Sequence, residues 1–112
     1  MAVDKFLSRV GEPDVVTFVL FTADWCMKCA PFKIHFLNKE RENTEETMVK
    51  FLVIDVDDDH AVSNFCTVIK VPTVQVWSQK SLIVEKQIIG TDEFDKMHSR
   101  FSTTDLLLVE DF

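Results

Sequence analysis

Apolar and polar positions alternate along the chain in blocks that predict four strands. The run 15–21 consists of β-branched and aromatic residues without charge, which is typical of a central strand covered on both faces. The run 48–56 is a second strong strand. Two further runs, 71–77 and 82–89, are separated by a short polar turn and are close enough in sequence to form a hairpin.

Helical spacing of apolar residues predicts four helices beside these strands. The predicted helices cover 3–10, a segment that follows the cysteine pair and runs to about Arg41, 60–68, and a segment that begins at Thr91 and carries Phe94, Met97, His98 and Phe101. In the second helix the residues expected to face inward are Cys29, Phe32, Phe36 and Leu37. The tail 105–112 fits either a further helical turn or an extra strand.

The order of these elements predicts the fold class. Early strands are joined by helices, as in parallel crossover connections, whereas the last two strands are joined by a short turn. This order predicts a mixed α/β sandwich. With 112 residues, of which 46% are hydrophobic, the chain fits a single domain over 1–112 with its own core.

Charge and hydropathy narrow the classes of partner. The 12 Lys and Arg residues against 19 Asp and Glu give a net charge of −7, opposite in sign to what binding to a nucleic-acid backbone requires. No stretch approaches the roughly 18 apolar residues of a membrane span, and residues 1–5 lack the basic and apolar regions of a signal peptide. We therefore expect a soluble, cytoplasmic protein that binds neither nucleic acid nor membranes.

Two of the three cysteines, Cys26 and Cys29, lie where strand 15–21 passes into the following helix. The first turn of a helix offers unpaired N–H groups and the positive end of the macrodipole, and both favour a thiolate. We therefore predict that Cys26 is a nucleophile. Cys29 is close enough to form a disulfide with it, since a helical turn brings the Cα atoms within about 4.4–6.8 Å. Three cysteines are too few for a disulfide scaffold, so the pair is interpreted as catalytic or metal-binding.

A metal site is the weaker interpretation of the pair. Zinc and iron–sulfur sites need four ligands, and the second Cys/His pair is missing unless two chains combine. The histidines, His35, His60 and His98, share no metal-ligand spacing and are predicted to lie on helix surfaces. The acidic run 57–59 is predicted to be a turn that caps the next helix.

Two other residues have structural interpretations. Cys66 shares helical spacing with Val62, which predicts a small buried residue on an inward face. Trp77 lies in the middle of a predicted strand and is interpreted as a packing residue. Trp25, next to the cysteine pair, is instead interpreted as part of a recognition surface.

The chain resembles the thioredoxin family. The resemblance covers residues 6–101 and rests on the element order, on Trp25-Cys26-x-x-Cys29 after the first strand, and on Val71-Pro72-Thr73 at the start of the third. The segment 51–58 and Gly90 also fall at thioredoxin-like distances from the cysteines. The resemblance implies a three-layer sandwich in which helices flank a mixed sheet of four to five strands.

The resemblance also implies a role for each residue of the site. Cys26 would attack a substrate disulfide, Cys29 would resolve the mixed disulfide, and Trp25 would form an apolar surface beside them. A second set of residues would bind the substrate: Pro72 in the cis form, the backbone of Val71 as a pairing partner for an extended segment, and Gly90 as a gap for the incoming chain.

The sequence departs from the family pattern between the two cysteines, in the strand before them and in the helix after them. Met27 and Lys28 replace the usual Gly-Pro, which places a cation in the turn. Leu20 stands where the family has a buried aspartate that accepts a proton from the resolving cysteine. The helix-kinking proline is replaced by Ile34, with Pro31 three residues earlier.

A further departure concerns the sheet. The sequence that would supply the family's first edge strand is not present before Met1, so we expect this edge to be open or covered by the tail 105–112.

Together these features predict a thiol–disulfide oxidoreductase that reduces protein or small-molecule disulfides through Cys26 and Cys29, without a bound cofactor. Its partners would be disulfide-containing proteins and an electron donor, either an NADPH-dependent thioredoxin reductase or glutathione, and we expect a monomer. Two alternatives stay open: a glutathione-linked disulfide reductase, and a binding module that uses the surface of Trp25 and Pro72 with little redox turnover. The two thiols favour the enzyme, because a pure adaptor does not need them.

Overall fold

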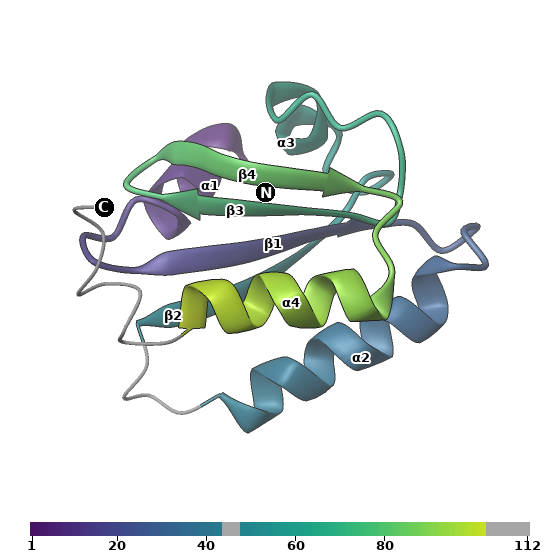
Figure 1. Cartoon of the computed structure of the whole chain (residues 1–112). Coiled ribbons are helices and arrows are strands. Elements are labelled where there is room, and N and C mark those ends of the chain that lie inside the picture. Colours follow the sequence, from purple (N-terminus) through teal and green to yellow (C-terminus); the bar gives the residue numbers. More distant parts are fainter. Residues whose placement is uncertain (44–47, 103–112) are drawn as a thin grey trace.

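The computed structural model describes residues 1–43 and 48–102 and contains one mixed sheet with the strand order β2-β1-β3-β4 (Figure 1). The strands are β1 (Val16–Thr22), β2 (Val49–Asp55), β3 (Thr73–Ser78) and β4 (Ser81–Gln87). The helices are α1 (Val3–Arg9), α2 (Cys29–Glu42), α3 (His60–Phe65) and α4 (Thr91–Ser102). The predicted order of elements and the predicted fold class are confirmed.

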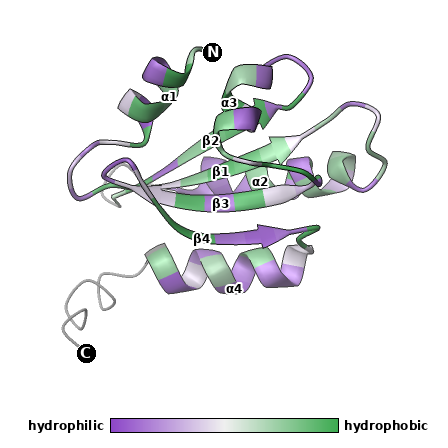
Figure 2. Cartoon of the chain, turned by 90° about the horizontal axis from the view of Figure 1, so that it is seen from above, coloured by the Kyte–Doolittle hydropathy of each residue, from purple (hydrophilic) through white to green (hydrophobic). Residues whose placement is uncertain are grey.

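The sheet is covered by helices on both faces. α2 and α4 lie on one face, and α1 and α3 lie on the other (Figures 1 and 2). β1 pairs in parallel with β2, and α2 forms the crossover between them. β3 pairs antiparallel with both β1 and β4, so the predicted hairpin is confirmed.

The core consists of two clusters, one on each side of β1. Phe18 and Leu20 point to the side of α2 and α4, whereas Val19 and Phe21 point to the side of α1 and α3, as the alternation of a strand requires. All four side chains are fully buried. β1 is therefore the central strand that its uncharged sequence predicted.

Trp77 is a packing residue, as predicted. Its ring meets Phe6 edge-on with centroids 5.3 Å apart, and its indole N–H donates to Gln75 Oε1 at 2.8 Å. Because the indole N–H has a partner, the residue can be 94% buried without an unsatisfied donor.

Several element ends differ from the sequence prediction because single residues take unusual backbone conformations. α3 ends at Phe65 rather than at 68, and β4 ends at Gln87 rather than at 89. Thr67 and Ile88, which follow these ends, have positive φ angles of 54° and 48°. The left-handed region continues neither a helix nor a strand, and it is especially rare for a β-branched residue such as Ile88.

α2 starts at the second cysteine of the pair and ends at Glu42, close to the predicted bounds. The helix begins at Cys29, with Lys28 as its N-cap residue, so Cys26 lies in the preceding turn. Pro31 occupies the first turn, where no N–H is needed. The helix then continues for 14 residues through Ile34, which is exposed.

Both outer strands have an edge without a strand partner among residues 1–43 and 48–102. β2 pairs only with β1, and β4 pairs only with β3. The tail 105–112, which was expected either to cover the β2 edge or to leave it open, lies outside the described residues. No helix in the described part of the chain is long and apolar enough to cross a membrane.

The acidic run forms a turn, but its side chains do not cap α3 as predicted. The carboxylate of Asp55 organises the turn by accepting the backbone N–H groups of Asp57 at 2.8 Å and Asp58 at 3.2 Å. Asp59 is the N-cap residue but makes no side-chain cap. Its carboxylate pairs with the N-terminal ammonium group of Met1 instead, and this charged partner displaces the cap.

The surface position predicted for the histidines is correct only for His60. His98 is half-buried, and its ring centroid lies 5.6 Å from Phe18 and 5.9 Å from Phe51. Burial and the charge of Lys39 lower the pKa of His98. His35 is also half-buried and joins α2 to α4, since its Nε2 lies 2.7 Å from Asp95 Oδ1.

Candidate active site

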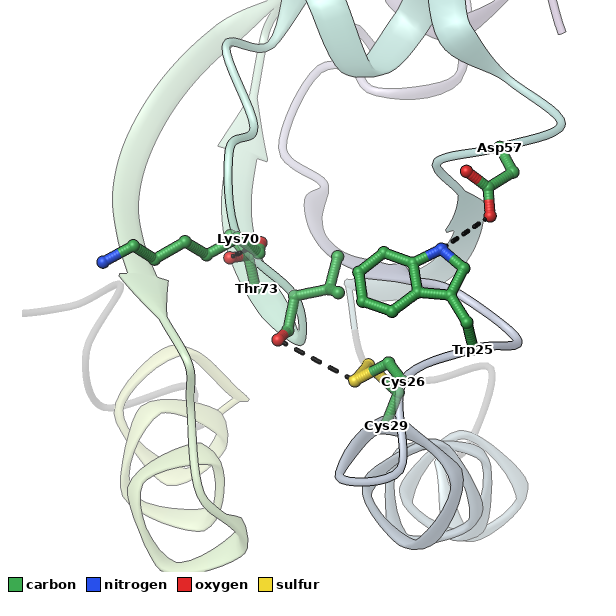
Figure 3. Close-up of a disulfide and its surroundings, with 7 residues drawn as sticks. Trp25, Cys26, Cys29, Asp57, Lys70 and Thr73 are labelled. Atoms are coloured by element: carbon green, nitrogen blue, oxygen red, sulfur yellow. Dashed lines mark hydrogen bonds between the residues drawn. A yellow bond between two sulfur atoms is a disulfide. The ribbon is translucent and has the colours of Figure 1, made fainter.

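The predicted cysteine pair forms a disulfide at the junction of β1 and α2 (Figure 3). Its Cα atoms are 5.2 Å apart. Two successive turns create this geometry: Cys26 N–H donates to Ala23 O, and Cys29 N–H donates to Cys26 O, both at 3.2 Å. Cys26 is half-buried, whereas Cys29 is 1% exposed. Only the first sulfur is therefore open to a reaction partner.

The loop before β3 lies against the pair. The bond between Val71 and Pro72 is cis, as predicted, and the Val71 carbonyl oxygen lies 3.9 Å from Cys26 Sγ. The loop is fixed on both sides of the proline. Thr73 Oγ1 donates to Lys70 O at 2.6 Å (Figure 3), and Ile89 N–H donates to Pro72 O at 3.1 Å.

Trp25 lies beside the disulfide with 69% of its surface exposed. Its indole N–H donates to Asp57 Oδ2 at 2.9 Å, which fixes the edge of the ring (Figure 3). The sequence did not identify Asp57 as part of the site. A signal was available, because β1 and β2 are parallel and the residues that follow them meet at one edge of the sheet.

A groove of about 390 Å³ runs from the start of α2 to the start of α4. Its lining includes Lys28, Pro31, Phe32, Pro72, Ile88, Gly90 and Glu93. Gly90 forms part of its wall, and the Gly90 N–H donates to Glu93 Oε1 at 3.1 Å. A Cβ atom at Gly90 would meet only this carboxylate, at 3.7 Å, so the glycine widens the groove without being sterically required.

The residues that depart from the family pattern occupy two different environments. Met27 is 91% exposed and Lys28 is also exposed, so the turn presents a cation toward the groove. Leu20 is fully buried in the same cluster as Phe32, which lies one turn after Cys29 on the inward face of α2. The position where the family has its buried aspartate is thus apolar in this chain.

Cys66 belongs to the opposite side of the sheet. It is 4% exposed and packs in the cluster that contains Val62, so the predicted inward position is confirmed. Burial, and secondarily the negative charge of Glu85, raise the pKa of this thiol to about 12. Cys66 is therefore protonated at neutral pH.

The described residues contain no group of three or more His, Cys, Asp or Glu side chains that could hold a metal ion. The cysteine pair itself can carry out thiol–disulfide exchange. When reduced, its accessible first thiol can attack a disulfide, and its buried second thiol, already at bonding distance, can displace the product.

Comparisons with known proteins agree with this chemistry. The family model described as Thioredoxin matches residues 1–103. Thioredoxin of Sus scrofa is 35% identical over 86 residues, which is 75% of each chain. The structure of a thioredoxin from Malassezia sympodialis superimposes with a TM-score of 0.83 at 20% identity, covering 91% of this chain and 89% of the other.

Thioredoxin NaTrxh from Nicotiana alata gives a TM-score of 0.78 at 21% identity and covers 89% and 84% of the two chains. At these identities the structural matches support the fold alone, whereas the sequence matches, together with the Cys26–Cys29 disulfide, support the activity. The chain belongs to the thioredoxin family and is a thiol–disulfide oxidoreductase.

Proposed function

We propose that the protein reduces disulfides of other proteins, with Cys26 as the attacking thiol and Cys29 as the resolving thiol. The observation that carries this assignment is the difference in exposure within one disulfide: Cys26 is half-buried beside the cis-proline loop, and Cys29 is 1% exposed. A substrate sulfur has access to the first residue and not to the second.

The reaction would proceed in two exchanges. The Cys26 thiolate attacks one sulfur of the substrate disulfide, which forms a mixed disulfide and releases the other substrate sulfur as a thiolate that takes up a proton. Cys29 then loses its proton and attacks Cys26 Sγ, which releases the second substrate thiol and leaves the Cys26–Cys29 disulfide. Two electrons pass to the substrate, and an external reductant must return them.

The substrate would bind as an extended segment across the groove. The Val71 carbonyl lies at the attacking sulfur and is an acceptor for a substrate N–H group. Exposed Trp25 and groove-lining Pro72 supply apolar surface, and Gly90 leaves the groove wide. Main-chain pairing of this kind requires no particular substrate sequence, which suits a reductase of many proteins.

Two electron donors are candidates. Members of the family need no bound cofactor, and an NADPH-dependent flavoprotein reductase is the donor that we propose first. Lys28 on the groove favours glutathione as a second candidate, because this tripeptide carries two carboxylates. We further propose that the protein acts as a monomer in the cytoplasm, which the net charge of −7 suits by keeping it soluble.

An insulin-reduction assay run in parallel with thioredoxin reductase and NADPH, and with glutathione, glutathione reductase and NADPH, tests the proposal. Activity should be lost in Cys26→Ser, while Cys29→Ser should trap a mixed disulfide with insulin. Cys66→Ser is the matched control and should keep full activity. Absence of turnover with both donors in the unsubstituted protein would instead support the binding-module alternative.

A further inference from the structure

A second groove, of about 360 Å³, lies between β4 and α4. The two elements run side by side at one margin of the molecule (Figure 2). The groove has an apolar floor of half-buried Val84, Met97 and Phe101. We call this surface, together with the charged residues around it, the β4–α4 groove.

The charges around the β4–α4 groove have the opposite sign to the protein as a whole. Lys86, Lys96 and Arg100 line it with Glu93 as the one anion among its lining residues, although the chain carries a net charge of −7. The Arg100 guanidinium lies over the Phe101 ring, 5.5 Å from its centroid. The cations are thus gathered around an apolar floor.

Glu93 offsets only one of the three positive charges in the lining. Its carboxylate lies 3.0 Å from Lys86 Nζ and accepts the Gly90 N–H, and the hydrogen bond from Lys86 is the main cause of its lowered pKa. Glu93 is therefore paired with Lys86. Among residues 1–43 and 48–102, Lys96 and Arg100 form no ion pair with a carboxylate, and both are exposed, although Lys96 is close enough to contribute to the lowered pKa of Glu93. With three cations and one anion in its lining, the groove presents a net positive charge to a ligand.

The β4–α4 groove adjoins the groove beside the active site. Glu93 lines both of them. From Glu93 to Arg100 the helix rises about 10 Å, at about 1.5 Å per residue, a length that three or four extended residues span at about 3.3 Å each. A segment of three or four extended residues that enters the β4–α4 groove beside Glu93 can therefore reach both cations.

We propose that the β4–α4 groove binds an acidic segment of the protein substrate and so selects disulfides that are flanked by acidic and apolar residues. This inference rests on the proposed function and adds a substrate preference to it. The occupant fits because carboxylates pair with Lys96 and Arg100 while apolar side chains cover Met97 and Phe101. Long-range attraction between opposite charges raises the rate of encounter, and salt screens it.

Three disulfide-linked peptides test the preference. They share the residues around the cysteine and differ in a four-residue extension, which is Asp-Leu-Glu-Asp, Gln-Leu-Gln-Gln or Lys-Leu-Lys-Lys. One series carries the extension before the cysteine, and a second series carries it after the cysteine. At about 10 mM ionic strength the second-order rate of reduction should be about fivefold or more higher for the acidic than for the neutral peptide in one series. At about 1 M salt, where the Debye length is about 3 Å, the difference should vanish.

Charge reversal locates the effect. In Lys96→Glu/Arg100→Glu the preference for the acidic peptide should be lost, while the rate with the neutral peptide stays unchanged. The matched control is Lys5→Glu/Arg9→Glu, which makes the same change in net charge at the same spacing on α1, on the opposite face of the sheet (Figure 1). A control that loses the preference equally would show a general charge effect and overturn the proposal.

A binding measurement separates this proposal from the proposed function. An acidic peptide with serine in place of cysteine should bind the unsubstituted protein in fluorescence anisotropy and should bind Lys96→Glu/Arg100→Glu at least fivefold more weakly. If no peptide is reduced, the proposed function fails, and the anisotropy measurement still shows whether the β4–α4 groove binds the acidic peptide. Equal binding to both proteins would overturn the inference.

Two other occupants have their own outcomes. A dimer seen by light scattering in the unsubstituted protein and lost in Lys96→Glu/Arg100→Glu would assign the groove to a second copy of the chain. A preference that is absent in the unsubstituted protein and emerges in Glu110→Lys/Asp111→Lys would assign it to the chain's own acidic end. Either result would overturn the proposal.

Discussion

Leu20 determines, by our interpretation, which step of the reaction is slow. Cys29 must lose a proton before it can resolve the mixed disulfide, and Leu20 offers no group that accepts it. Because Leu20 is fully buried in an apolar cluster and Cys29 is itself 1% exposed, we expect burial to disfavour the Cys29 thiolate. We therefore expect mixed disulfides at Cys26 to accumulate in the unsubstituted protein, and their decay to accelerate about tenfold per pH unit below the pKa of Cys29.

Leu20→Asp supplies the missing acceptor, and Leu20→Asn is its matched control because asparagine has a similar size and polarity but takes up no proton. Both substitutions remove a fully buried leucine between Val53 and Val74 and bury a polar group. Each should lower the free energy of unfolding by about 3–5 kcal/mol. This is a large part of the about 5–15 kcal/mol typical of a domain, so the kinetics are best measured at low temperature.

Rapid acid quench followed by mass spectrometry measures the mixed disulfide directly. At pH 7 its decay should be about tenfold faster in Leu20→Asp than in Leu20→Asn, below the about 10²–10⁴-fold that an optimally placed general base contributes. The reasoning is refuted if the mixed disulfide never accumulates in the unsubstituted protein and the two variants decay at the same rate. Water or another side chain would then accept the proton.

Four further predictions concern single groups. Cys26 should alkylate at neutral pH faster than a free thiol of pKa about 8.5, and Lys28→Ala should slow it, whereas a profile like that of a free thiol would contradict the role of the helix end and of Lys28. Because a stabilised thiolate favours the reduced form, equilibration with glutathione should give a potential above thioredoxin's about −270 mV, and a value at or below this would show that the cation has no net effect. Native Cys66, with its pKa raised to about 12, should resist iodoacetamide at pH 8, and Cys66→Ser should leave insulin reduction unchanged. The buried Cys66 thiol contributes stability that is present below about pH 9 and is lost as the pH rises toward 12. His98 has a lowered pKa, so its contribution is present above about pH 6.5 and is lost as the pH falls, and urea midpoints should fall less from pH 7 to 5 in His98→Phe than in the control His60→Gln.

The sequence predicted the fold and the redox pair because both are encoded locally. The uncharged run in β1 identified the central strand, and the spacing of Trp25, Cys26 and Cys29 identified the site. The apolar spacing of α4 even included His98 among its inward positions, but the polar residue type outweighed this periodicity in the prediction. The structure shows that the imidazole packs there among phenylalanine rings.

The remaining differences depend on information that a local pattern does not carry. The positive φ angles of Thr67 and Ile88 are imposed by the surrounding fold, so neither residue type marked the end of its element. The hydrogen bond from Trp25 to Asp57 joins residues 32 positions apart, and it becomes visible only once β1 and β2 are paired in parallel. The β4–α4 groove likewise collects its cations from a strand and a helix.

The strand order has a consequence for how the chain folds. β1 and β2 are joined through α2, and β3 and β4 through a tight turn, so each of these pairs can form from neighbouring chain. The contact between β1 and β3 closes a much longer loop, since Phe21 pairs with Thr73 and Thr17 with Trp77. Closing such a loop costs entropy before its contacts form, so docking of the two halves along β1 is expected to limit the folding rate. Until then the edge of β1 that later pairs with β3 stays open to strands of other chains. We therefore expect the nascent N-terminal half to be the form of this protein most exposed to aggregation.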